Sequence, residues 1–132
     1  MDKRIEHINM QLLDEFKKRR HLIQDALEYA DNSHTPEDVW SAIEKKRAQL
    51  WPLPNSVIVT EIVSYPAGRS VRLWLAAGDM DELLEAEPFI AKWGKEHYGC
   101  KKVEIIGRKG WIKKLKDYQH KAVLLSKEIK DE

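Results

Sequence analysis

The segment whose residue types point most directly to chemistry is the run Gly107-Arg108-Lys109-Gly110-Trp111. Its two glycines permit a tight strand-to-helix turn with backbone conformations that other residues avoid. Successive N–H groups in such a turn, with the cationic side chains of Arg108 and Lys109, could form an anion-binding nest. The alternative is a structural turn whose Trp111 anchors the following helix in the core. An anion site is therefore expected here before any other place.

Residues that bind metals or act as nucleophiles show no such organisation. A single cysteine, Cys100, excludes an intramolecular disulfide and a cysteine-only metal cluster. His97 lies three residues before it, yet no further Cys or His pair completes a zinc site. We expect Cys100 to be a small buried residue at a helix end. The histidines, which share no ligand spacing, are His7, His21, His34, His97 and His120.

Charge is distributed unevenly, although the formal net charge is only +1. Residues 31–91 carry ten acidic and five basic side chains, whereas residues 92–132 carry twelve basic and six acidic ones. Complementary halves of one solvated surface explain this pattern. The alternative is a basic face for nucleic acid, with interleaved aromatic residues that could stack on bases. The sequence contains no helix-turn-helix, zinc-finger or RNP motif.

The composition is typical of one folded domain. The chain has 132 residues, which is the size of a single domain, and 42% of them are hydrophobic, including five Trp, which argues against disorder. No apolar run approaches the roughly 20 residues that span a bilayer. Charged residues open the chain without the apolar core of a signal peptide, so we expect no secretion by that route.

The N-terminal part of the chain is predicted to be helical. Apolar residues recur at three- and four-residue steps over residues 4–30, without Gly or Pro. A continuous helix would be about 40 Å long, as wide as the whole domain, so its start either spans the domain or projects toward a partner. The run Lys17-Lys18-Arg19-Arg20 could instead mark a bend between two helices.

A second helix and an extended stretch follow the turn at residues 31–34. Thr35 is predicted to cap the helix, with Pro36 at its first position and Asp38 as the capping-box acid. This helix should fade near Arg47. Residues 51–55 contain two prolines and are predicted to be rigid and extended.

Two strands are predicted over Ser56–Ser64 and Ser70–Ala77, joined by a hairpin-like connection. Glu61 on the first strand could pair with Arg72 on the second. Alternation places Val71, Leu73 and Leu75 on one face of the second strand, with Arg72 and Trp74 on the other.

The rest of the chain alternates between helix and strand. Asp79 should cap a helix that continues through Pro88 to about Tyr98, where Gly99 stops it. A third strand over 103–106, a short helix over 111–116 and a last strand over 122–126 complete the order. These elements predict an α+β or α/β fold with helices packed on a sheet.

Several aromatic and glycine motifs then carry a family resemblance. They are Asp38-Val39-Trp40 with Ala42-Ile43, Ala48-Gln49-Leu50-Trp51-Pro52, Val59-Thr60-Glu61-Ile62, Tyr65-Pro66, Leu73-Trp74-Leu75-Ala76 with Gly78-Asp79, and Gly107-Arg108-Lys109-Gly110-Trp111. Over about residues 20–128 the chain resembles small GNAT-like proteins of tailed bacteriophages and prophages, and more distantly the internal virion protein of short-tailed coliphages. The element order is that of GNAT acyltransferases without their first strand.

This resemblance implies one α+β GNAT-like domain over residues 1–132. N-terminal helices, with an extension over about residues 1–30, would precede a mixed, mostly antiparallel sheet with helices packed on it. In a GNAT enzyme, N–H groups of a basic, glycine-rich turn hold the pyrophosphate of acetyl-CoA. The matching turn here, residues 76–82, has one Gly, no basic residue and several acids. A diphosphate there would meet like charges, each costing on the order of 1 kcal/mol or more at short range.

The resemblance also implies which residues would form an active site. If the protein is active, acetyl-CoA would lie against the backbone of Leu75, Ala76, Ala77 and Gly78, with Arg108, Lys109 and Gly110 as further contacts. Glu61 would be the general base, and Tyr118 would protonate the leaving thiolate. Both residues also have structural interpretations, as a sheet-face carboxylate and a packing residue.

Three functions remain open. The leading one is a phage-type GNAT-like protein with a degraded acyl-CoA site and no cofactor, acting in the virion or its assembly. Its partners would be phage structural proteins or a second copy bound through the N-terminal helix, in the host cytoplasm or the virion. The alternatives are an active acyl-CoA-dependent N-acyltransferase and a nucleic-acid-binding accessory protein that uses the basic C-terminal third.

Overall fold

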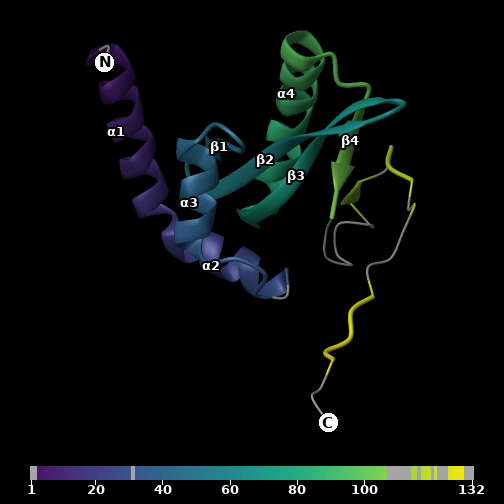
Figure 1. The fold of residues 1–132 in the computed structure, drawn as a ribbon, viewed down its shortest axis with the longest axis horizontal. Coiled ribbons are helices and arrows are strands. Elements are labelled where there is room, and N and C mark those ends of the chain that lie inside the picture. Colours follow the sequence, from purple (N-terminus) through teal and green to yellow (C-terminus); the bar gives the residue numbers. More distant parts are fainter. Residues whose placement is uncertain are drawn as a thin grey trace.

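The computed structural model describes residues 3–30, 32–106, 114–115, 117–119, 121 and 125–129, with side chains from residue 10 onward. The fold is α+β, with helices packed on a mixed sheet, as predicted (Figure 1). The elements are α1 (Lys3–Lys18), α2 (Arg20–Tyr29), α3 (Pro36–Glu44), β1 (Gln49–Pro52), β2 (Ser56–Tyr65), β3 (Gly68–Gly78), α4 (Met80–Tyr98) and β4 (Lys102–Ile105).

The sheet has the order β1-β2-β3-β4. The first three strands are antiparallel, and β4 runs parallel to β3 because α4 carries the chain back across the sheet. The β3–β4 pairing extends only from Ser70 to Leu73 on β3. From Trp74 onward, that edge of β3 has no strand partner among the described residues.

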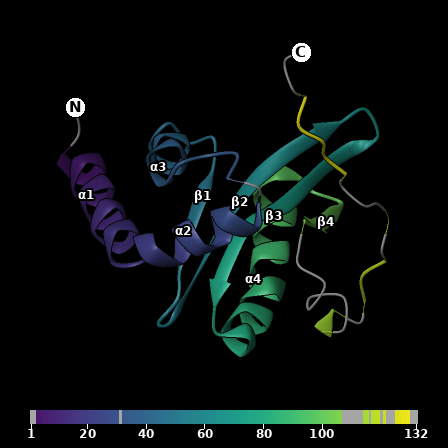
Figure 2. The ribbon, with the colours of Figure 1, turned by 90° about the horizontal axis from the view of Figure 1, so that it is seen from below.

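Helices cover both faces of this sheet (Figures 1 and 2). One core lies under α2 and α3, where Ile23, Leu27 and Val39 meet Val57 and Val59. The other lies under α4. It contains Leu83 and Ile90 of α4 with Ile58, Val71 and Leu73 of the sheet. Neighbouring residues of β2 point to opposite faces, so β2 contributes to both cores.

A β-bulge in β3 corrects the predicted side-chain alternation. Val59 pairs with Leu75 while Thr60 pairs with Leu73, so Trp74 is an extra residue in β3. Two residues on one strand then face one on the other, which reverses the alternation beyond that point. Leu73 packs toward α4, whereas Leu75 joins the core under α2 and α3, where Trp74 also packs. The prediction that Leu75 shares a face with Val71 and Leu73 is therefore wrong.

The N-terminal helix bends at Arg19, which confirms the two-helix alternative. α1 lies at the outer edge of the fold and packs inward through Phe16, whose ring lies 5.4 Å from that of Trp40 (Figure 1). α2 belongs to the core, since Ile23 and Leu27 are completely buried.

The predicted helix caps are confirmed. Thr35 Oγ1 accepts from the Asp38 N–H at 3.2 Å, and the Asp38 carboxylate accepts from the Thr35 N–H at 2.9 Å. Asp79 Oδ1 accepts from the Glu82 N–H, and Gly99 ends α4 in the left-handed conformation with φ +65°. The caps at Thr35, Asp79 and Gly99 all depend on hydrogen bonds between near neighbours in the chain, which explains why the sequence alone predicts them.

The strand predictions differ from the structure at β1 and β4, and others lie outside the described residues. β1 was not predicted as a strand; it begins before the expected extended stretch and pairs with β2. β4 is shifted by one residue from the predicted range 103–106. The turn at 107–110, most of the helix at 111–116 and most of the strand at 122–126 lie outside the described residues. Within the described part of the chain, no helix is long and apolar enough to cross a membrane.

Candidate functional site

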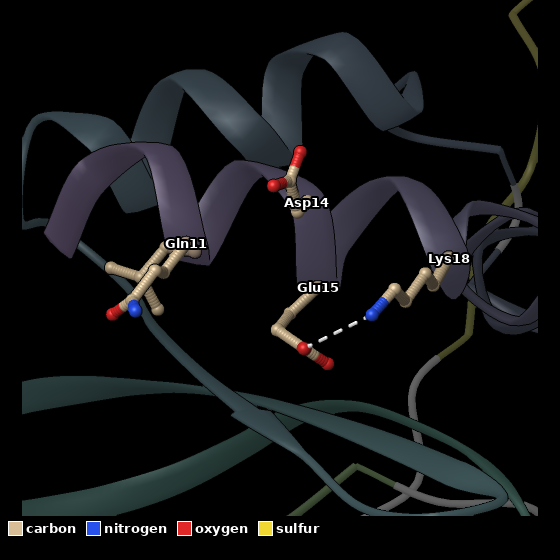
Figure 3. Close-up of a pocket in the computed structure, with 5 residues that line it drawn as sticks. Gln11, Asp14, Glu15 and Lys18 are labelled. Atoms are coloured by element: carbon tan, nitrogen blue, oxygen red, sulfur yellow. Dashed lines mark ion pairs between the residues drawn. The ribbon is translucent and has the colours of Figure 1, made fainter. Parts of the chain in front are cut away.

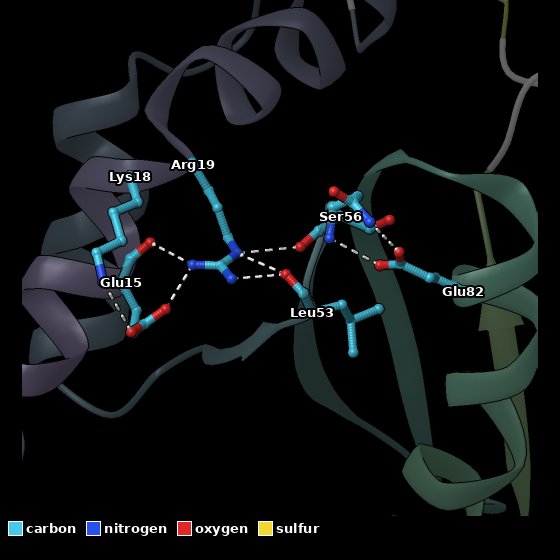
Figure 4. A network of polar contacts seen from close by, with 7 residues as sticks. Glu15, Lys18, Arg19, Leu53, Ser56 and Glu82 are labelled. Carbon is cyan, nitrogen blue, oxygen red and sulfur yellow. Dashed lines mark hydrogen bonds and ion pairs between the residues drawn. The ribbon is translucent and has the colours of Figure 1, made fainter.

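The turn before α4, where the resemblance would place a cofactor phosphate, is occupied by the chain's own carboxylates, of which Figure 4 shows Glu82. Glu82 accepts two bonds from Asn55, one from the backbone N–H at 2.9 Å and one from Nδ2 at 2.8 Å. These bonds from the Asn55 backbone and side chain hold the pKa of Glu82 below its usual value. Ser56 Oγ accepts from the Asp79 N–H at 2.8 Å. The positive end of α4 therefore carries fixed negative charge.

Gly78 is required by the packing of this turn. Its φ is +120°, and a Cβ atom there would lie 2.4 Å from the Asn55 carbonyl oxygen and 2.6 Å from Ser56 Oγ. The absence of a side chain thus lets β3 approach the β1–β2 turn. Packing of the chain against itself thus accounts for glycine at this position.

The other predicted cofactor residues on β3 offer only backbone groups. Leu75 and Ala77 are buried in the core under α2 and α3, and Ala76 is half-buried on the α4 side. Their backbone pairs with β2 on one edge. The opposite edge is the part of β3 that lacks a strand partner in the described chain.

Glu61 lies on the face of the sheet that α2 and α3 cover. Its predicted pairing with Arg72 is confirmed, with 3.5 Å between Glu61 Oε1 and Arg72 Nη1. Arg72 also contacts Glu104 Oε2 at 3.2 Å and donates to the Tyr65 hydroxyl at 3.1 Å. Glu61 is therefore one end of a charged network along the sheet surface.

Glu61 and Trp74 also line an open hollow of about 390 Å³ between α3 and the sheet. The ring of His34 stands edge-on to the Trp74 indole, with centroids 5.0 Å apart. The Thr35 backbone and side chain lower the pKa of Asp38 through their hydrogen bonds. The remaining lining residues are Ser41, Ala42 and Arg47. The Trp74 indole thus lies among four ionisable side chains. They are the carboxylates of Asp38 and Glu61, the guanidinium of Arg47 and the imidazole of His34.

The sequence did not predict this hollow. Asp38 was predicted only as a cap, and His34 only as part of a turn. Asp38, Ser41 and Ala42 are three and four residues apart on a helix, so they share one face. That spacing could have indicated that the three side chains lie on one helix face. The sheet residues that this face contacts depend on tertiary packing, so neighbouring residues could not predict them.

Tyr118 lies on the other side of the sheet from Glu61. Its hydroxyl donates to Glu87 Oε1 of α4 at 2.8 Å. Burial, followed by the hydrogen bond and charge of Glu87, raises the pKa of Tyr118 far above its ordinary value. Since α4 packs on the face opposite α2 and α3, the structure does not bring Glu61 and Tyr118 together.

A second hollow of about 390 Å³ lies beside α1 (Figure 3). Glu15 and Lys18 form an ion pair of 3.5 Å at its edge. A hydrogen bond from Arg19 is the main cause that lowers the pKa of Glu15. All of the lining residues come from this one helix, so no separate elements converge on it: Gln11, Leu12, Asp14, Glu15 and Lys18.

The remaining sequence candidates give no site in the described residues. Arg108, Lys109 and Gly110 lie outside them. Cys100 is buried directly after α4, as predicted, and burial raises the pKa of its thiol. No group of three metal-ligating side chains occurs in the described ranges.

Comparison with known proteins identifies no family for this chain. No protein-family model, curated protein or solved structure matches it. The residues of the site and the motifs of the sequence are therefore what support a function for this chain.

Proposed function

We propose that this chain is a phage-type GNAT-like protein with a degraded acyl-CoA site, which acts as an accessory protein in the virion or in its assembly. The observation that carries the proposal is the carboxylate-filled N-terminus of α4. The phage assignment rests on the sequence motifs, and the loss of cofactor binding rests on this geometry.

Negative charge at the start of α4 opposes the binding of a phosphate there. A free helix N-terminus attracts phosphate through its N–H groups and its dipole. Here the Asp79 carboxylate accepts a hydrogen bond from the Glu82 N–H, and the Asn55 N–H donates one to the Glu82 carboxylate. A diphosphate would have to displace these groups or approach them together with Asp81. Each repulsion costs on the order of 1 kcal/mol or more at short range.

The positions of the two candidate catalytic residues support the same proposal. Glu61 is paired with Arg72, and the Tyr118 hydroxyl donates a hydrogen bond to Glu87 on the opposite side of the sheet. General acid–base catalysis requires both groups within reach of one substrate. Their separation favours a role in binding over a role in acyl transfer.

Calorimetric titration with acetyl-CoA tests this proposal, with plain CoA as the ligand control. We expect no binding by the natural chain up to millimolar ligand. Asp79→Asn with Glu82→Gln removes two charges but keeps groups that can cap and accept bonds. This double variant should gain measurable affinity. Micromolar binding by the natural chain would contradict the proposal and call for activity tests of Glu61→Gln and Tyr118→Phe.

The accessory role has its own test. The protein should be present in purified phage particles, or its removal should change the yield of complete particles. Its absence from particles, combined with a normal particle yield in a deletion strain, would exclude this role.

An acyl-CoA-dependent N-acyltransferase is the second candidate. It is favoured by the edge of β3 from Leu75 to Gly78, which has no strand partner among the described residues and whose backbone groups could bind an extended amide-containing ligand as an added strand does. The same titration distinguishes the two candidates.

A further inference from the structure

Three segments that carry positively charged residues lie together at one end of the sheet, where Figure 1 shows the ribbon of each. These segments are the β2–β3 hairpin, the C-terminus of α4 and the beginning of β4. The Lys101 N–H donates to the Arg69 carbonyl at 2.9 Å, and Lys102 lies opposite Ser70 in the β3–β4 pairing. Lys95 is in the last turn of α4. We call Arg69, Lys95, Lys101 and Lys102 the cationic end.

Among the described residues, the cationic end keeps its positive charge. All four side chains are exposed, and none forms an ion pair with a described residue. The acids on the same segments are already paired, Glu96 with Lys92 at 3.9 Å and Glu104 with Arg72 at 3.2 Å. Arg69 donates to the Tyr98 carbonyl at the end of α4. The negative end of one helix dipole amounts to about half a charge, far less than four cations.

Tyr98 adds an aromatic surface beside these cations. Its side chain is 39% exposed, and its ring is held at 5.2 Å from that of Trp93. Trp93 in turn packs against Trp51, which lies in the core under α4. The partly exposed Tyr98 ring is therefore the outer member of a row of aromatic rings that reaches the core under α4. Such a platform suits stacking of an unpaired base.

We propose that the cationic end and Tyr98 bind single-stranded nucleic acid. The four cations contact backbone phosphates, and Tyr98 stacks on one base. An acidic peptide would use the cations but would gain nothing from the aromatic platform. The surface combines Arg69, from the acidic middle of the chain, with lysines from its basic third. The proposed nucleic-acid binding does not depend on the proposed loss of cofactor binding.

Fluorescence anisotropy of a labelled oligothymidylate, measured over a range of salt, tests the phosphate contacts. The logarithm of affinity should fall with the logarithm of salt concentration by about 0.7 per phosphate contact, or between two and three overall. Lys101→Gln with Lys102→Gln should reduce that slope by about 1.4. Lys17→Gln with Lys45→Gln removes the same charge from exposed sites on α1 and at the end of α3 and should leave the slope unchanged.

Tyr98 is tested by two further variants in the same assay. Tyr98→Ala should weaken binding by about fivefold or more without changing the salt slope, whereas Tyr98→Phe should keep the affinity. Circular dichroism confirms that each variant is folded. Three outcomes would overturn the proposal: no binding at low salt, equal losses in the two lysine pairs, or displacement of the oligonucleotide by polyglutamate as efficiently as by unlabelled oligothymidylate. The last outcome would indicate an acidic protein partner.

Discussion

Gly78 sets how closely β3 and the β1–β2 turn approach each other. Its φ of +120° and the contacts that a Cβ would make exclude an ordinary side chain. We expect Gly78→Ala to lower the free energy of unfolding by about 2–3 kcal/mol, measured by urea denaturation. Gly99→Ala is the matched control, because its φ of +65° is strained but no atom lies within 4 Å of the added carbon. That variant should lose about 1 kcal/mol. Equal losses would show that steric contact at Gly78 is unimportant.

Tyr118 should make stability depend on pH in the alkaline range. Its pKa is raised in the folded protein by burial and by Glu87, while the phenol of the unfolded chain ionises near pH 10. The stabilising contribution is therefore complete below about pH 10 and is lost as the pH rises further. The free energy of unfolding of the natural protein should fall more steeply above that pH than that of Tyr118→Phe. Parallel curves for the two proteins would contradict the burial of this hydroxyl.

At the scale of elements, Arg19 fixes the joint between α1 and α2 (Figure 4). Its guanidinium donates to the Leu53 carbonyl at 2.6 Å and to the Ser56 carbonyl at 3.2 Å, while its side chain is only 14% exposed. Arg19→Met should lower the free energy of unfolding by about 2 kcal/mol, because charge-assisted bonds are lost. Amide hydrogen exchange in α1 should become faster.

The neighbouring Arg20 provides the control for this joint. It forms an exposed ion pair of 2.6 Å with Glu37. Exposed pairs contribute little, so Arg20→Met should leave both the unfolding curve and the exchange of α1 nearly unchanged. If both variants behaved alike, α1 would be held by packing of Phe16 rather than by the Arg19 contacts.

The whole molecule consists of two cores that share one sheet. Ile23 and Ile90 are completely buried, one in each core. We expect Ile23→Ala and Ile90→Ala each to cost about 2–5 kcal/mol. Because β2 and β3 contribute to both cores, each variant should still unfold in a single transition, seen at the same urea concentration by tryptophan fluorescence and circular dichroism. Separate transitions would indicate that the two faces fold independently.

Local features of the fold were predictable because their causes lie within a few residues. The capping box of Thr35 and Asp38, the cap at Asp79 and the stop at Gly99 depend on bonds between near neighbours. The runs of β-branched residues predicted β2 and β3 within a few residues of their ends. β1 was missed because Pro52 and Pro54 interrupt the strand pattern, although the segment pairs with β2, the next strand along the chain, and the Trp51 indole N–H donates to Thr60 Oγ1 at 2.9 Å.

Local sequence was enough for the helices, for β2 and β3, for the helix caps and for the acidic start of α4, since propensity and capping act over short distances. Only the tertiary structure decided which side chains meet. The bulge at Trp74 changed the face that Leu75 occupies. The packing of α4 placed Tyr118 away from Glu61, and the β3–β4 pairing brought Arg69 beside Lys101. The Tyr118–Glu87 and Arg69–Lys101 contacts each join residues more than thirty positions apart. The geometry of such contacts depends on strand register and on which face each helix covers.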